Sequence, residues 1–362
     1  MSEHHHRHHH RHHHHHHHHS IWYRIRRWVR HNKGLAAGGT VIVAAAVLAG
    51  GTYLHSSQQA QKKMHVTAGN SVDMKNGYRT RTYDGREYQY NSLITTILYA
   101  GIDSEGKMEA STAYSNKARA DSIALVIMDK KNQKMSILAL NRDTMTQIRR
   151  YTREGDDMGL YTSHLGYAYS YGDGGEVSCE NLEEAVQLLI GGIPISDYVV
   201  TNRSSMPEIN RLVGGVTVTV PNNDLAEKHP DLKEGTVVTL DDSNIEDFLR
   251  YRDTTKDFSN EGRIARQQTY ISAYISQFKQ LLQEDLESAW TQSQEMADHL
   301  QTSITKSKYL GLANLLQSVS FTDADYYRPE GMDQLGDLHD EFYVDEDALE
   351  KLIIDLFYEP VS

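Results

Sequence analysis

Short apolar runs punctuated by polar turns dominate residues 92–240, and this pattern predicts β-strands. The runs at 92–103, 121–129 and 134–144 are rich in β-branched residues, and the polar turn KKNQ joins the last two. Two such runs separated by a short turn predict an antiparallel hairpin. Further strands are expected in DYVVTN and in GGVTVTVP.

Segments with helical periodicity lie between these runs and after them. Residues 180–192 (ENLEEAVQLLIGG) predict an amphipathic helix with Ser178 as its cap and Gly191 as its stop. The segment SNIEDFLR predicts a shorter helix that ends near Arg250, and 262–283 predicts a long one. KSKYLGLANLLQSV and DEDALEKLIIDLF predict two more. Strands and helices mix without strict alternation, which predicts one α/β domain with a mixed central sheet flanked by helices.

The N-terminal region differs in character from the rest. Residues 34–54 form a run of about 21 residues without a charge, long enough to cross a bilayer as a helix. Arginines and a lysine precede this run, so the positive-inside rule places the N-terminus in the cytoplasm. A cleaved signal peptide is the alternative. The expected order is a cytoplasmic His-rich basic tail (1–33), a transmembrane helix (34–54), a stalk or linker (55–91) and an extracellular domain (92–362).

Charge excludes one class of function. The chain carries a formal net charge of −12, and residues 1–34 hold seven Lys/Arg and one acid, or +6, which leaves −18 for the rest. Such an acidic domain repels nucleic-acid backbones, so no nucleic-acid partner is expected. Cys179 is the single cysteine, so an intramolecular disulfide is impossible, and no Cys/His spacing suggests zinc.

The segment RYRDTTKDFSNEGRIARQQ gathers arginines within this acidic domain. Arg250 and Arg252 share a face if the chain is extended there, and Arg263, Arg266 and Gln267 are neighbours at helical spacing. The planar fork of arginine matches phosphate oxygens, so the segment favours a phosphate site. The alternative is structural, with the arginines complementing a helix dipole or pairing with nearby acids on a solvated surface.

A second group of charged residues lies where the predicted strands end. Asp103 follows the first run, Arg119 and Asp121 open the second, and Arg142 and Asp143 follow the third. Each of these residues alone would be an ordinary charged residue at the exposed end of a strand. Together, carboxylates and guanidinium groups suit a divalent cation, Mg²⁺ or alternatively Mn²⁺, bound with a diphosphate.

At these residues the chain resembles the LytR–CpsA–Psr family of bacterial cell-envelope proteins. The resemblance covers residues 92–280, and weaker similarity continues to the end of the chain. Four motifs carry it in order: Arg119, Asp121 and Ser122 before an apolar strand, Arg142–Asp143 after the next, LDDSNIEDFLRYR, and GRIARQQ from Gly262 to Gln268.

Three features depart from the family pattern. Asn260 stands where the family often has an aspartate, and Asp257 lies further back. In HLGYAYSYG, His164 and Gly166 occupy the polar places of a more conventional family segment, and the loop between Asp103 and Arg119 is long. These departures leave the fold expectation intact and put substrate detail in doubt.

The resemblance implies a membrane-anchored phosphotransferase. It would pass a glycosyl phosphate from an undecaprenyl pyrophosphate-linked glycopolymer, such as a teichoic acid or a capsular polysaccharide, to a peptidoglycan acceptor. Carried over by position, the residues that grip the diphosphate are Arg119, Arg142, Arg250, Arg252, Arg263, Arg266 and Gln267, with Asp103 and Asp121 holding Mg²⁺ and Asp121 alternatively acting as a base.

Such a donor also requires an apolar tunnel in the protein, because it carries a prenyl tail. IALVIM, AVQLLI and YISAYISQF could line one, although they also suit plain core. A non-catalytic module that binds polyprenyl phosphate or wall polymer, and a transcriptional attenuator, are the alternative functions.

Overall fold

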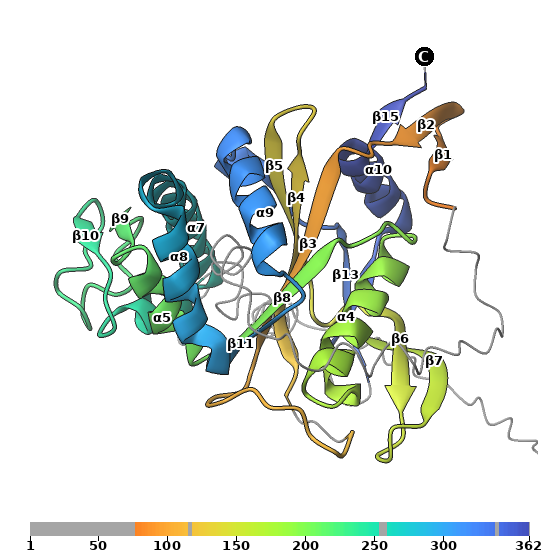
Figure 1. The fold of residues 1–362 in the computed structure, drawn as a ribbon, viewed down its shortest axis with the longest axis horizontal. Helices are drawn as coiled ribbons and strands as arrows, with labels where there is room; N and C mark the ends of the chain where they lie inside the picture. The colour runs from red at the N-terminus through yellow and green to blue at the C-terminus, as the bar shows by residue number, and fades with distance from the viewer. Residues whose placement is uncertain (1–76, 115–117, 253–258, 337–339, 362) are drawn as a thin grey trace, which may run out of the picture.

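A six-stranded mixed sheet forms the centre of the molecule in this computed structural model, which describes residues 77–114, 118–252, 259–336 and 340–361 (Figure 1). The strand order is β11-β8-β3-β4-β5-β12. The pairs β3–β4 and β4–β5 are antiparallel, while β3–β8 and β5–β12 are parallel. The strands are β3 (Ile94–Ile102), β4 (Ala120–Asp129), β5 (Lys134–Leu140), β8 (Asp197–Asn202), β11 (Leu300–Thr302) and β12 (Tyr326–Tyr327).

Helices cover both faces of this sheet. In Figure 1, α4 (Glu176–Leu189) and α10 (Glu346–Phe357) lie on one side of it, and α5 (Ser205–Leu212), α7 (Ser259–Glu284), α8 (Leu286–Ser293) and α9 (Lys306–Ser318) lie on the opposite side. Phe248 and Leu249 of α6 (Ile245–Arg250) belong to the same hydrophobic cluster as α7. The fold class expected from the sequence is therefore confirmed.

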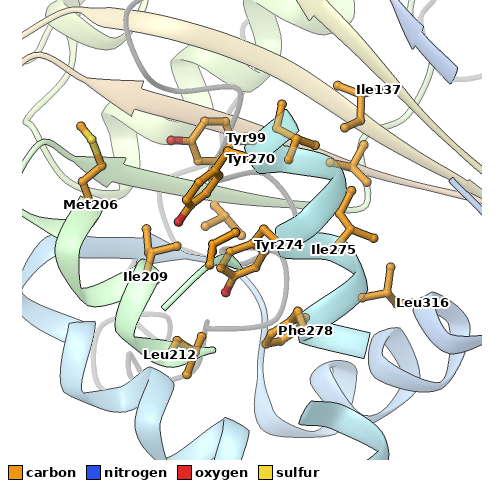
Figure 2. Close-up of a cluster of buried hydrophobic side chains, with 14 of the residues drawn as sticks. Tyr99, Ile137, Met206, Ile209, Leu212, Tyr270, Tyr274, Ile275, Phe278 and Leu316 are labelled. Carbon is orange, nitrogen blue, oxygen red and sulfur yellow. The ribbon is translucent and has the colours of Figure 1, made fainter. Parts of the chain in front are cut away.

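Alternation along the strands divides the core into two layers. On β4, Ala124, Val126 and Met128 join one hydrophobic cluster, whereas the residues between them join the other. Figure 2 shows Tyr99 of β3 beside Tyr270 and Tyr274 of α7 in the first layer. The rings of Tyr270 and Tyr274 stack with their centroids 6.0 Å apart. The α7 side of the sheet is thus a packed apolar layer.

This division corrects one expectation about the apolar segments. AVQLLI places Ala185 and Val186 in the α4 layer, while YISAYISQF places Ile271 and Phe278 in the α7 layer. The sheet separates the two segments, so they do not line a single tunnel together.

The long strands and most helices lie where the apolar pattern predicts them. The predicted hairpin is β4–β5, paired in antiparallel register from Ile123↔Leu140 to Asp129↔Lys134. Gly191 follows α4 with φ +75, as expected of a helix stop. Ser178 as the cap is wrong, because α4 begins two residues earlier. The Asp173 carboxylate accepts hydrogen bonds from the backbone N–H groups of Gly175 and Ser178 and does the capping instead.

Part of the expected stalk belongs to the folded domain. Strands β1 (Thr80–Tyr83) and β2 (Arg86–Tyr90) form a hairpin that pairs with β15 (Tyr358–Pro360) near the C-terminus. Arg81 secures it by donating to the Ile190 and Gly191 carbonyls and by contacting Glu350. The domain therefore starts before residue 92.

Within the described residues, three further strand pairs and four 3-10 helices lie around this frame. The pairs are β6 (Met145–Tyr151) with β7 (Asp157–His164), β9 (Thr217–Thr219) with β10 (Val237–Thr239), and β13 (Gly331–Leu335) with β14 (Asp340–Val344). The short helices are η1 (Leu165–Tyr167), η2 (Tyr169–Tyr171), η3 (Gln294–His299) and η4 (Asp323–Asp325).

The expected tail (1–33), transmembrane helix (34–54) and first part of the stalk lie outside the described residues. Within the described ranges, no helix combines the length and the apolar character needed to cross a bilayer.

Candidate functional site

Asp103 and Arg119 face each other where β3 ends and β4 begins. The Asp103 carboxylate accepts a 2.6 Å hydrogen bond from the Arg119 backbone N–H. Its other oxygen lies 3.7 Å from Arg119 Nε. The Arg119 guanidinium also lies over the ring of Tyr167, 5.6 Å from the centroid. Antiparallel pairing of β3 with β4 brings these two residues together across a long connecting segment.

The turn after β5 presents the next pair of charged residues. Arg142 contacts the carboxylate of Asp121 on β4, and its Nε lies 3.6 Å from Asp143. Asn141 shapes the turn, because its side-chain oxygen accepts a 2.9 Å hydrogen bond from the Asp143 N–H. Burial raises the pKa of Asp143, and the Arg142 charge opposes that rise.

Gly166 allows a neighbouring segment to close over this turn. Its N–H donates to the Arg142 carbonyl at 2.8 Å. A Cβ at this position would lie 2.7 Å from the Ala120 carbonyl oxygen, closer than real side chains approach. The glycine in HLGYAYSYG is therefore needed for packing against the start of β4, which carries Asp121 and directly follows Arg119.

Arg250 and Arg252 lie at the end of α6, as the sequence predicts. The helix ends at Arg250, and Tyr251 has extended backbone dihedrals (φ −56, ψ 135). Arg250 donates a 2.6 Å hydrogen bond to Glu246, one turn earlier in the same helix. Glu246 also contacts Arg203, so one carboxylate is shared by two guanidinium groups.

Arg266 corrects an expectation, because its side chain has no exposed surface. Its guanidinium donates to the backbone carbonyls of Phe248 (2.9 Å) and Tyr251 (2.5 Å), and to the side chains of Asn222 (2.9 Å) and Asp224 (2.6 Å). These bonds hold the chain between Arg250 and Arg252 in place. Arg266 is thus a positioning residue and not part of a ligand-binding surface.

Gln267 and Gly262 complete the same packing arrangement. Gln267 is buried and donates a 2.9 Å hydrogen bond to the Leu249 carbonyl. A Cβ at Gly262 would lie 2.0 Å from the Asp224 carboxylate that binds Arg266. The glycine, the second arginine and the first glutamine of GRIARQQ therefore fix α7 against the end of α6.

Arg263 lies at the centre of a group of like charges. Its residue is only 6% exposed, and this burial lowers the pKa of its guanidinium to about 10. Four positively charged side chains contribute to the same downward shift, namely Arg252, Arg266, Arg250 and Arg328. Crowding of buried positive charge is costly unless an anion is bound there.

Arg328 was not predicted from the sequence. It follows β12, which runs parallel to β5, and it lines a hollow together with Asp121 and Arg142. Arg328 therefore connects the two groups of charged residues that the sequence indicated separately. The signal in the sequence is the run Tyr326-Tyr327-Arg328-Pro329, which is short and begins nearly sixty residues after GRIARQQ.

The expected metal ligands, Asp103 and Asp121, both lie close enough to influence the Arg119 charge. Among the described residues, no group of three or more His, Cys, Asp or Glu side chains could hold a metal by itself. Mg²⁺ commonly binds through one or two carboxylates and completes its shell with water and substrate phosphate. The two carboxylates of Asp103 and Asp121 fit the protein's share of that arrangement.

The departure at Asn260 is not resolved by the geometry. Asp257 lies outside the described residues, and the side chain of Asn260 belongs to the part of α7 that is not described.

Comparison with known proteins bears on these motifs together. TagU of Bacillus cereus, a polyisoprenyl-teichoic acid–peptidoglycan teichoic acid transferase, is 27% identical over 241 residues, 65% of this chain and 68% of that protein. TagT of Bacillus subtilis, a transferase of the same description, is 24% identical over 319 residues, 85% of this chain and 89% of that protein.

A solved structure titled "TagT bound to LIIa-WTA" superposes with a TM-score of 0.51 at 20% identity, covering 74% of this chain and 90% of that one. This likeness shows a shared fold. The sequence profile of the LytR_cpsA_psr family matches residues 51–353, which include every motif described above. The chain belongs to the LytR_cpsA_psr family.

Proposed function

We propose that this protein is a phosphotransferase that moves a glycosyl phosphate from a polyprenyl diphosphate carrier to peptidoglycan. The observation that carries the proposal is the nearly buried Arg263 among other guanidinium groups, joined through the Arg328 hollow to Asp121 and Arg142. Such a site suits a compact polyanion. The names of the TagU and TagT relatives, which are polyisoprenyl-teichoic acid–peptidoglycan transferases, support the same substrate class.

The reaction is a substitution at the sugar-linked phosphorus. An acceptor hydroxyl oxygen forms a bond to that phosphorus, the bond from phosphorus to the bridging oxygen breaks, and polyprenyl phosphate leaves. The hydroxyl proton passes to a base, for which Asp121 is the candidate. Phosphoryl transfer depends mainly on positioning and on neutralising charge, which guanidinium groups provide.

In its alternative role, Asp121 would hold Mg²⁺ together with Asp103, and the ion would supply further neutralisation of phosphate charge. The remaining roles belong to arginine side chains of this protein. Arg252 and Arg263 bind phosphate oxygens, Arg142 holds Asp121 in position, and Arg266 fixes the backbone on which Arg250 and Arg252 stand.

A membrane anchor at 34–54 would give the protein access to a lipid-linked donor. Confinement to one surface raises the effective concentration of donor and enzyme for each other. Under this proposal the folded domain lies outside the cell, where peptidoglycan is found.

Release of polyprenyl phosphate by the full-length protein in detergent, with lipid-linked polymer and peptidoglycan, tests the proposal. Wild type should turn the donor over, whereas Arg252→Ala and Arg263→Ala should not. Arg211→Ala provides a surface control, because Arg211 pairs with Asp242 and its side chain is 58% exposed. Binding of donor without turnover by wild type would indicate a non-catalytic binding module instead.

A further inference from the structure

Arg328 stands at the same edge of the sheet as Arg142. Tyr326 and Tyr327 pair in parallel register with Ile137 and Leu138 of β5. Parallel strands end at a common edge, so Arg328 emerges beside the end of β5, immediately before the turn that carries Arg142. The two arginines thus come from segments far apart in the chain and reach one place.

A hollow separates the two segments and is lined by residues of both. One wall carries Asp121, Ser122 and Arg142, and the opposite wall carries Tyr326, Arg328 and Phe342. The second wall is attached to the first, because the Phe342 N–H donates a 2.8 Å hydrogen bond to the Asp143 carbonyl. Because of this hydrogen bond, we treat the wall formed by Tyr326, Arg328 and Phe342 as part of the site.

The Arg328 guanidinium is directed by its neighbour Tyr326. It lies over the Tyr326 ring, 5.3 Å from the centroid, and donates a 3.4 Å hydrogen bond to the phenolic oxygen. Arg328 is half-buried, and its charge reaches Arg263 on α7. A phosphate group in the hollow would therefore lie between Asp121 on one side and a cation of fixed orientation on the other.

The residues around Arg328 decide which phosphate this is. Tyr326 and Phe342 line the hollow beside Arg328, and aromatic side chains of this kind can pack against a sugar ring. The sugar-linked phosphate, which is the one attacked, therefore belongs in the hollow. The prenyl-linked phosphate then lies towards Arg263 and Arg252, on the face of the sheet where α7 packs.

Building on the proposed function, we propose that Arg328 binds the sugar-linked phosphate of the donor, which is the group transferred, and that Tyr326 and Phe342 form a surface for the attached sugar. Arginines 252 and 263 bind the prenyl-linked phosphate, which leaves as polyprenyl phosphate. Arg328 thus stabilises charge on the reacting phosphorus, and the others stabilise the leaving group.

The test compares two measurements on full-length Arg328→Ala, Arg328→Lys, Arg263→Ala and the surface control Arg211→Ala. Transfer from a lipid-linked polymer gives kcat and KM. Affinity for farnesyl phosphate reports binding of the leaving group alone. Arg328→Ala should lower kcat about 100-fold or more, because it removes a donor aimed at the reacting group, while its affinity for farnesyl phosphate stays within about 3-fold of wild type. Arg263→Ala should weaken farnesyl phosphate binding at least about 10-fold.

Arg328→Lys should recover part of the lost kcat, because it restores the charge without the planar fork. An unchanged kcat in Arg328→Ala would overturn the assignment. Equal losses of farnesyl phosphate affinity in Arg328→Ala and Arg263→Ala would place Arg328 at the prenyl-linked phosphate instead, and would also overturn it. Thermal unfolding of each variant separates these outcomes from misfolding.

Failure of the proposed function gives a different result. Wild type would then release no polyprenyl phosphate, whatever the state of Arg328. Binding of farnesyl diphosphate N-acetylglucosamine still tests the present inference in that case. Arg328→Ala should weaken binding of this sugar-bearing probe at least about 10-fold, and an unchanged affinity would contradict the inference.

Discussion

Two arginines in the same domain, Arg149 and Arg263, have opposite surroundings. Arg149 on β6 donates hydrogen bonds to both carboxylate oxygens of Glu184, at 2.7 Å and 2.6 Å, and a third to Asp157 at 2.6 Å. These hydrogen bonds raise its pKa. Burial and the positive charge of other arginines lower the pKa of Arg263 to about 10.

The difference separates two uses of the same side chain. Where carboxylates surround the guanidinium, its charge is neutralised within the protein and the pair links β6 to α4. Where other guanidinium groups surround it, positive charge accumulates at a cost that an anionic ligand would offset. Under the proposed function, Arg263 serves the ligand and Arg149 serves the fold.

The largest expected effect is on transfer after removal of Arg263. Arg263→Ala should lower transfer by about 10³-fold, the scale found when an arginine that stabilises phosphoryl-transfer charge is lost. Thermal unfolding of the variant distinguishes this loss of transfer from a loss of folding. If Arg263→Ala unfolds more readily than wild type but keeps its transfer activity, then Arg263 has the structural role that we assign to Arg149.

Arg266→Ala should produce the largest loss of stability. The substitution breaks hydrogen bonds to the carbonyls of Phe248 and Tyr251 and leaves Asp224 without its buried partner. A loss of about 3 kcal/mol in unfolding free energy is expected, measured by denaturant unfolding. Arg266→Lys should not restore it, since an ammonium group cannot reproduce the forked set of bonds. Stability close to wild type would show that these bonds are dispensable.

Arg149→Ala should give the opposite pattern to Arg263→Ala. Loss of the paired hydrogen bonds to Glu184 should lower the unfolding free energy by about 1–3 kcal/mol. Transfer by the folded fraction should remain within about 2-fold of wild type, because Arg149 stabilises β6 against α4 and has no place in the proposed site. A large drop in kcat with intact folding would mean that the paired arginine also serves the reaction.

Glu183 tests the same two causes of a pKa shift, burial and nearby like charge, on an acidic side chain, where they raise the pKa instead of lowering it. Burial, together with the nearby carboxylates of Glu180 and Asp197, raises its pKa from 4.5 to about 7. The folded protein therefore holds this proton more tightly than the unfolded chain, and the resulting stability is lost as pH rises from 4.5 to about 7. Glu183→Gln should match wild type near pH 4.5 and exceed it by about 1–3 kcal/mol above pH 7.

Denaturant unfolding across this pH range measures the difference. Glu227→Gln is the matched control, because it removes an exposed carboxylate by the same substitution. A constant difference between Glu183→Gln and wild type at all pH values would show that Glu183 does not titrate in this window.

The sequence predicted the frame of the molecule because its strands and helices are long and strongly periodic. The β4–β5 hairpin and α7 were confirmed on that basis. The β1–β2 hairpin was missed because it is polar, and its pairing with β15 depends on contacts nearly three hundred residues apart. Local pattern carries no information about such pairing.

The candidate site shows the same limit. Spacing placed Arg119 and Asp121 where a strand begins and Arg250 and Arg252 at a helix end, and the structure has Arg119 directly before β4, Asp121 within it, and the two other arginines at the end of α6. Spacing could not show that Arg266 points into the protein, because burial is decided by Asn222 and Asp224 from another segment. Arg328 enters the site through the parallel pairing of β12 with β5, which no local motif reveals.

The most direct measurement is a crystal structure of the protein with a polyprenyl diphosphate-linked sugar and Mg²⁺. Both phosphates should lie in the guanidinium-lined region, one within hydrogen-bond distance of Arg252 or Arg263 and the other beside Asp121, Arg142 and Arg328. Density for the diphosphate on another face of the domain, with these arginines retaining their present contacts, would contradict the account.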